Sequence, residues 1–64
     1  MVTINGEKVN AAGLKVSEYL EQNGYDLQKI AVELNEEILP KSQYDGTVLN
    51  ENDFIEVVSF VGGG

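Results

Sequence analysis

The sequence predicts an α+β fold in which one main helix crosses one face of a mixed sheet of about five strands. Three observations carry this prediction. An Asn-Gly dipeptide separates two short β-prone segments, a single apolar stripe with helical spacing follows, and the longest β-prone run occupies residues 54–61. The resulting order, β-β-α-β-β-β, leaves the helix to fold across the sheet.

Residues 1–10 are predicted to form a β-hairpin. Two strands, at about 1–5 and 6–10, are joined at Asn5-Gly6. A type I′ turn needs positive φ at both of its central positions, and Asn followed by Gly meets this need most readily.

The apolar stripe with helical spacing consists of Val16, Tyr19 and Leu20, at positions i, i+3 and i+4. We expect a helix of about two turns that ends before Gly24, because glycine suits the left-handed position just past a helix end. The start of this helix is weak, since Lys15 occupies the cap position where Ser, Thr, Asp or Asn would be favourable.

The second half of the chain predicts one helical turn and three strands. Asp26 is expected to cap the turn within the polar connector 25–29, and the alternating residues 30–34 form a strand. A short strand at 38–39 ends before a proline, which cannot donate to a ladder. Residues 54–61 form the last strand, and Asp53 serves the turn before it.

For the sheet to close, the first hairpin and the last strand must meet, so the last strand is expected at the centre. That arrangement is a β-grasp. Its predicted core contains Val2, Ile4, Val16, Leu20, Ile30, Val32, Leu34, Leu49, Ile55 and Val57. The tyrosines are expected to be half-buried with solvated hydroxyl groups, namely Tyr19, Tyr25 and Tyr44. We assign residues 1–61 to this domain and residues 62–64 to a flexible tail.

Composition excludes several classes of function. The 64 residues suffice for one small domain, and they include no Cys and no His, so zinc sites, disulfides and thiol or Ser-His nucleophiles are absent from the sequence. A net charge of −7 disfavours nucleic acid and anionic membranes as partners, and suits either a basic partner or simple solubility. Without an apolar run of about 20 residues or a signal-peptide pattern, the cytoplasm is the expected compartment.

The chemistry of the chain is expected at three consecutive glycines, Gly62, Gly63 and Gly64. The interpretation without a function is that these glycines are a frayed tail or a cloning remnant. The functional interpretation is that a segment without Cβ atoms threads a narrow channel in a partner's active site. There the ionised Gly64 carboxylate could attack the α-phosphate of ATP, if the partner supplies Mg²⁺ and positive charge. The sequence has no P-loop of its own, so the domain would be a substrate and not a catalyst.

Several segments together resemble the ThiS family of sulfur carriers, which are ubiquitin-like β-grasp proteins of thiamine biosynthesis. The resemblance rests on residues 31–35 followed by Ile38-Leu39-Pro40, on the helix entry, and on residues 60–64, and it covers nearly the whole chain. Two positions depart from the family's usual pattern. Glu36 stands after Asn35 where Gly is usual, and Lys15 stands where the family has Thr or Ser, so both departures concern stability.

The resemblance implies a cycle of sulfur transfer. An E1-like adenylyltransferase, using ATP and Mg²⁺, would activate Gly64 as an acyl-adenylate. Sulfur from a cysteine desulfurase would replace AMP and leave a C-terminal thiocarboxylate. Thiazole synthase would then take this sulfur for the thiazole ring of thiamine. The chain itself would bind no cofactor and would not be an enzyme.

A candidate docking patch for these partners precedes the glycines. If the polar Glu56 faces outward, alternation places Val58 and Phe60 on the same outer face, next to Val61 and the tail. The competing interpretation is that a crossing loop covers Phe60 and makes it part of the core. Phe60→Ala should weaken adenylation and leave the fold intact, whereas unfolding of that variant would reassign Phe60 to the core.

Three other functions stay open at this point. The small subunit of molybdopterin synthase uses the same thiocarboxylate chemistry but is typically longer. A ubiquitin-like protein modifier would be joined to lysines through Gly64 and would produce isopeptide-linked targets. An interaction module with idle glycines would be unaffected by deletion of Gly63 and Gly64.

Overall fold

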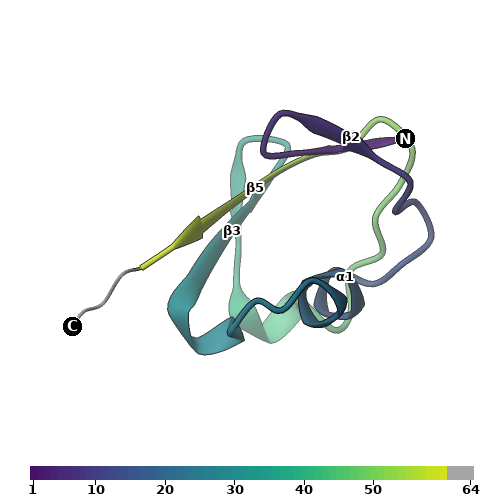
Figure 1. Ribbon diagram of the computed structural model, residues 1–64. Coiled ribbons are helices and arrows are strands. Elements are labelled where there is room, and N and C mark those ends of the chain that lie inside the picture. Colours follow the sequence, from purple (N-terminus) through teal and green to yellow (C-terminus); the bar gives the residue numbers. More distant parts are fainter. Residues whose placement is uncertain (61–64) are drawn as a thin grey trace.

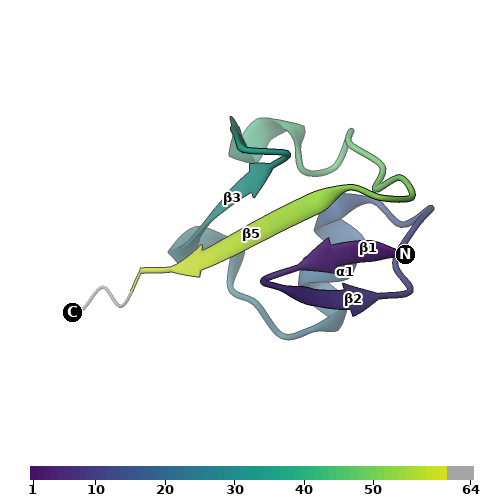
Figure 2. The same ribbon diagram turned by 90° about the horizontal axis from the view of Figure 1, so that it is seen from above.

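A computed structural model describes residues 1–60 of the chain, and their backbone forms a five-stranded mixed sheet in the order β2-β1-β5-β3-β4. A helix, α1, packs below one face of this sheet (Figure 1). The elements are β1 (Val2–Ile4), β2 (Glu7–Val9), α1 (Val16–Gln22), β3 (Ile30–Leu34), β4 (Glu37–Leu39) and β5 (Phe54–Ser59), with single 3₁₀ turns at Leu27–Lys29 and Lys41–Gln43. The predicted β-grasp, with the last strand at its centre, is therefore confirmed. Figure 2 shows β5 lying between β1 and β3.

The first hairpin forms where the sequence predicts it. Asn5 and Gly6 have φ values of 50° and 86°, as a type I′ turn requires. Strands β1 and β2 pair antiparallel around this turn, with Ile4 opposite Glu7. Both strands are shorter than predicted, because Asn5 and Gly6 form the turn and are not part of the ladder.

Helix α1 has the weak start that its sequence predicts, and the rest of the fold compensates for it. The Lys15 side chain makes no capping hydrogen bond, although its backbone N–H donates to Glu18 Oε1 at 2.8 Å. The backbone N–H groups of Val16 and Ser17 donate to the carbonyl oxygens of Thr47 (2.8 Å) and Tyr44 (3.1 Å). The loop of residues 44–47 therefore satisfies two of the helix's unpaired donors, which a side-chain cap would otherwise do.

The core lies between α1 and the sheet, and it contains three residues that were not in the predicted core, Ala11, Leu39 and Tyr44. All the predicted core residues are buried except Leu34, which is only partly buried. Tyr44 was expected to be half-buried, but its side chain is only 3% exposed. The turn at Lys41–Gln43 carries the chain across the end of the core and places this ring inside it. Burial raises the pKa of the Tyr44 hydroxyl, and a hydrogen bond with the backbone of Val32 opposes this shift.

The turn between β3 and β4 contains a strained residue. Asn35 and Glu36 have φ values of 51° and 71°, and the left-handed region is unfavourable for a residue with a Cβ such as Glu36. We expect Glu36→Gly to raise the free energy of unfolding by about 1 kcal/mol, measured by urea denaturation.

The neighbouring Glu37 provides the control for this prediction, because it is also exposed but begins strand β4. Glu37→Gly should lower the free energy of unfolding, since glycine loses the most conformational entropy in a strand. A destabilised Glu36→Gly variant would contradict the proposed strain.

Among residues 1–60, no helix is long and apolar enough to cross a membrane.

Candidate functional site

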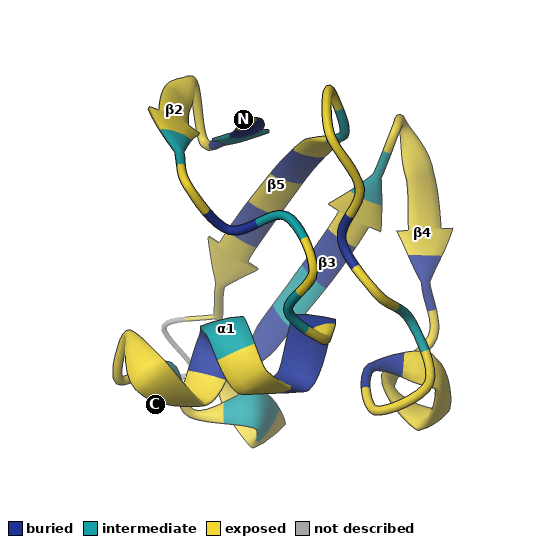
Figure 3. Cartoon of the chain, turned by 90° about the vertical axis from the view of Figure 1, so that its right-hand side faces the viewer, coloured by how far each residue is buried: buried dark blue, intermediate teal, exposed yellow. Residues whose placement is uncertain are grey.

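The central strand β5 presents its side chains alternately to the two faces of the sheet. Ile55 and Val57 are buried against the core, whereas Glu56 is exposed. Val58 and Phe60 follow on the same face as Glu56, with 55% and 52% of their side chains exposed. Bands of buried and exposed residues along β5 show this alternation (Figure 3). The outward position of both side chains is confirmed, and the interpretation of Phe60 as a core residue is wrong.

Strand β5 is held along both of its edges. It pairs in parallel with β1 at Phe54 and Ile55, and antiparallel with β3 over five residue pairs that end at Ile30 and Ser59. One further bond, from the Phe60 N–H to the Lys29 carbonyl at 2.7 Å, continues the pairing beyond the strand. The backbone is thus anchored up to the last described residue. Val61, Gly62, Gly63 and Gly64 lie outside the described residues, so their predicted roles stay predictions.

Two asparagine side chains extend this anchoring. The Asn5 amide accepts from the Val57 N–H at 2.8 Å and donates to the Val57 carbonyl at 3.3 Å, so it acts as an additional peptide group next to β1. On the other edge of β5, Asn35 Oδ1 accepts from the Phe54 N–H at 2.9 Å. The sequence predicted a turn at Asn5 and a departure from the family pattern beside Asn35, and neither indicated a contact with β5. Their second role depends on contacts across the sheet, about which the local sequence carries no signal.

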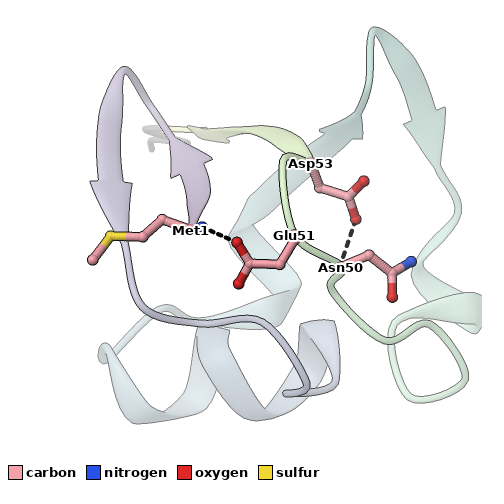
Figure 4. Close-up of polar contacts among 4 residues, drawn as sticks. All are labelled: Met1, Asn50, Glu51 and Asp53. Carbon is pink, nitrogen blue, oxygen red and sulfur yellow. Dashed lines mark hydrogen bonds and ion pairs between the residues drawn. The ribbon is translucent and has the colours of Figure 1, made fainter.

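The loop that precedes β5 is organised by Asp53, as predicted. Asp53 Oδ2 accepts from the Asn50 N–H at 2.8 Å, and Oδ1 accepts from Asn35 Nδ2 at 3.1 Å. Next to this turn, the amino group of Met1 forms an ion pair with Glu51 (Figure 4). The Asp53 carboxylate therefore joins the 50–53 turn to the β3–β4 hairpin, and it fixes the position at which β5 begins.

The side of the sheet that faces away from α1, which we call the outer face, carries more apolar surface than the sequence predicted. Phe54 and Ile38 are 61% and 77% exposed. Phe54 borders two hollows of about 440 and 320 Å³. The first is lined by Glu33, Asn35, Glu36, Phe54 and Glu56, and the second by Met1, Thr3, Lys8, Asn52 and Phe54. The alternation that exposes Val58 also applies to Phe54, so the sequence did contain a signal for this residue.

The side chains on the outer face are suited to recognition of another protein. Within residues 1–60 there is no group of His, Cys, Asp or Glu side chains that could hold a metal ion. Exposed aromatic and aliphatic side chains next to carboxylates form a surface suited to binding another protein. The glycine segment follows directly after the anchored end of β5 in the sequence.

Comparison with known proteins gives consistent results along the whole chain. The model of the ThiS family matches residues 2–64. The sulfur carrier protein ThiS of Thermus thermophilus is 38% identical over 64 residues, which cover all of both chains. The crystal structure of the thiamine biosynthesis protein ThiS from Geobacter metallireducens superimposes with a TM-score of 0.77 at 34% identity, over 98% of this chain and 97% of that one.

A longer relative is also similar to this chain. A thiazole synthase of Paramagnetospirillum magneticum is 45% identical over 64 residues. The match covers 98% of this chain but only 20% of the thiazole synthase. A region similar to this domain therefore forms about a fifth of that enzyme.

Proposed function

Because this chain belongs to the ThiS family of sulfur carriers in thiamine biosynthesis, we propose that Gly64 carries the sulfur as a thiocarboxylate. An oxygen of the Gly64 carboxylate attacks the α-phosphate of ATP in an E1-like adenylyltransferase, and pyrophosphate leaves. The terminal sulfur of a persulfide on a cysteine desulfurase then attacks the acyl carbon, and AMP leaves. A thiol reductant, such as excess cysteine, supplies the two electrons that cleave the resulting acyl disulfide and leave the thiocarboxylate. The adenylyltransferase supplies Mg²⁺ and the positive charge that stabilises the phosphates, while this chain supplies the nucleophile.

The observation that best supports this proposal is the anchoring of β5 up to Phe60. Asn5 holds Val57 on one edge, and Lys29 holds the Phe60 N–H on the other. A partner that binds the outer face therefore meets a rigid strand from which the glycine segment follows. Rigid presentation lowers the entropic cost of placing a reacting group in a partner's active site.

Thiazole synthase is the proposed acceptor of the sulfur. The region of the Paramagnetospirillum magneticum thiazole synthase that is similar to this chain supports that choice. Carrier and acceptor would then meet in the cytoplasm, with Gly62 and Gly63 in the channel of the partner and Val58, Phe60 and Val61 against its surface.

The proposal is tested by the intact mass of the chain after incubation with the adenylyltransferase, ATP, Mg²⁺, cysteine and a cysteine desulfurase. We expect a mass increase that corresponds to replacement of one oxygen by sulfur. A chain that lacks Gly64 is the control and should show no such change. An unchanged mass, with enzymes that are active on another carrier, would contradict the proposal, and isopeptide-linked targets would indicate a protein modifier.

Phe60→Ala tests the docking role of the outer face. Because about half of this side chain is exposed, its loss should leave the melting temperature within about 3 °C of the wild-type value. The kcat/KM of adenylation, measured by exchange of labelled pyrophosphate into ATP, should fall roughly tenfold. Val48→Ala is the matched control, because Val48 is 45% exposed and lies outside the sheet. An equal loss in both variants would contradict docking through Phe60.

A further inference from the structure

A pair of like charges lies at the centre of the outer face. Glu33 in β3 stands directly opposite Glu56 in β5, and both residues are exposed. Side chains directly opposite each other on one face of a sheet have Cβ atoms about 5 Å apart, and like charges in this position destabilise the sheet. The pairing comes from residues 23 positions apart in the sequence, so it is visible only in the folded chain.

The described part of the chain offers this pair no neutralising cation. Among residues 1–60, neither carboxylate forms an ion pair, and the one ion pair present joins Met1 to Glu51. Lys8 lies in β2, which two strand spacings separate from β5. Lys29 pairs with the chain at Phe60, four residues from Glu56, which corresponds to about 13 Å along a strand. Among residues 1–60, no ion pair therefore compensates the repulsion between the two glutamates.

Apolar side chains surround the glutamate pair. Phe54 and Val58 flank Glu56 on the same face of β5, and both are more than half exposed. Ile38 stands opposite Glu33 in β4 and is 77% exposed. The hollow of about 440 Å³ beside the pair has room for the end of a long side chain. A cation that entered it would lie against Phe54, the one apolar residue of its lining, and would also meet a third carboxylate, Glu36. Both contacts favour a positive charge between the two glutamates.

From this geometry we propose that the outer face binds a basic, partly apolar surface of thiazole synthase, with a cationic side chain of the enzyme between Glu33 and Glu56. This inference rests on the proposed function. Charge complementarity argues for a cationic partner, because the chain has a net charge of −7 and two of its glutamates stand side by side on the outer face. We propose thiazole synthase as the partner that binds the outer face, because a region similar to this chain forms part of one such enzyme. Arginine fits best, since its planar group can bind two carboxylates at once.

The test compares charge-neutralising variants at two places on the molecule. Glu33→Gln and Glu56→Gln each remove one charge of the pair, and the double variant removes both. Glu21→Gln is the control, because it removes one charge from the exposed side of α1, which packs on the other side of the sheet. Affinity of each full-length chain for purified thiazole synthase is measured by calorimetry at about 50 mM and about 300 mM salt. The double variant should bind roughly 30-fold more weakly at low salt, with a smaller salt dependence. Glu21→Gln should change the affinity less than about twofold.

Stability measurements separate loss of contact from loss of fold. Because the substitutions relieve repulsion, the double variant should melt about 2–5 °C above the wild-type chain. Weaker binding by a more stable protein would support the proposal. Unchanged affinity for thiazole synthase, or weakening toward the adenylyltransferase alone, would overturn it. Thiocarboxylate formation by the wild-type chain keeps this outcome distinct from failure of the carrier function, because that failure would abolish the mass increase before any substitution is made.

Discussion

Gly63→Ala is expected to slow conversion of the chain to its thiocarboxylate by roughly 100-fold, because a small displacement of a reacting group can cost that much in rate. The added methyl group lies one residue from the reacting carboxyl, where the partner's active site must close around the backbone. A time course of intact mass with limiting adenylyltransferase measures this rate. The folded domain should be unaffected, so affinity for the partner through the outer face should fall far less than the rate.

A second glycine provides a matched control for this substitution. A Cβ on Gly46 would meet only the Gln43 carbonyl oxygen, at 4.0 Å, which is ordinary van der Waals contact. Gly46→Ala should therefore react at nearly the wild-type rate. Full activity of Gly63→Ala would show that the partner does not confine the glycine segment, and the proposed threading would then be wrong.

Leu20→Ala is expected to have the largest effect on stability. Leu20 lies at the centre of the core and is 1% exposed. Truncation of a buried leucine costs about 2–5 kcal/mol, and a domain of this size is rarely stabilised by more than about 3–5 kcal/mol. A large fraction of the variant should thus be unfolded near 37 °C, as a thermal melt followed by circular dichroism would show.

The control for the core substitution is Ile38→Ala, because Ile38 is 77% exposed. Its melting temperature should stay within about 4 °C of the wild-type value. If Leu20→Ala melted as late as Ile38→Ala, the core described here could not be the main source of stability.

The parts of the fold that could be predicted are those that local chemistry determines. Asn5-Gly6 identifies a type I′ turn on its own, since few other dipeptides accept two positive φ values. Alternation along residues 54–60 determines which side chains face outward, and the outward position of Val58 and Phe60 follows from it. Phe54 follows from the same rule, and the prediction omitted it only because it lies far from the glycines in the sequence.

The parts that could not be predicted depend on contacts between distant segments. The carbonyl oxygens of Tyr44 and Thr47 support the start of α1, and nothing near Lys15 in the sequence indicates this. The buried position of Tyr44 follows from the path of the loop around it, not from its neighbours. Likewise, the Glu33–Glu56 pair requires the register between β3 and β5, which a one-residue slip would destroy.

The central position of β5 has a consequence for how this protein is made. The ribosome synthesises a chain from its N-terminus at about 5–20 residues per second, so β5 emerges after the other four strands of the sheet. Before that moment β1 and β3 have no strand between them, and an isolated two-stranded hairpin is at best marginally stable in water. The sheet therefore closes only after synthesis has passed Ser59. Folding then requires the long-range pairing of Thr3 with Phe54, and contacts between residues so far apart in the sequence are the kind that form slowly.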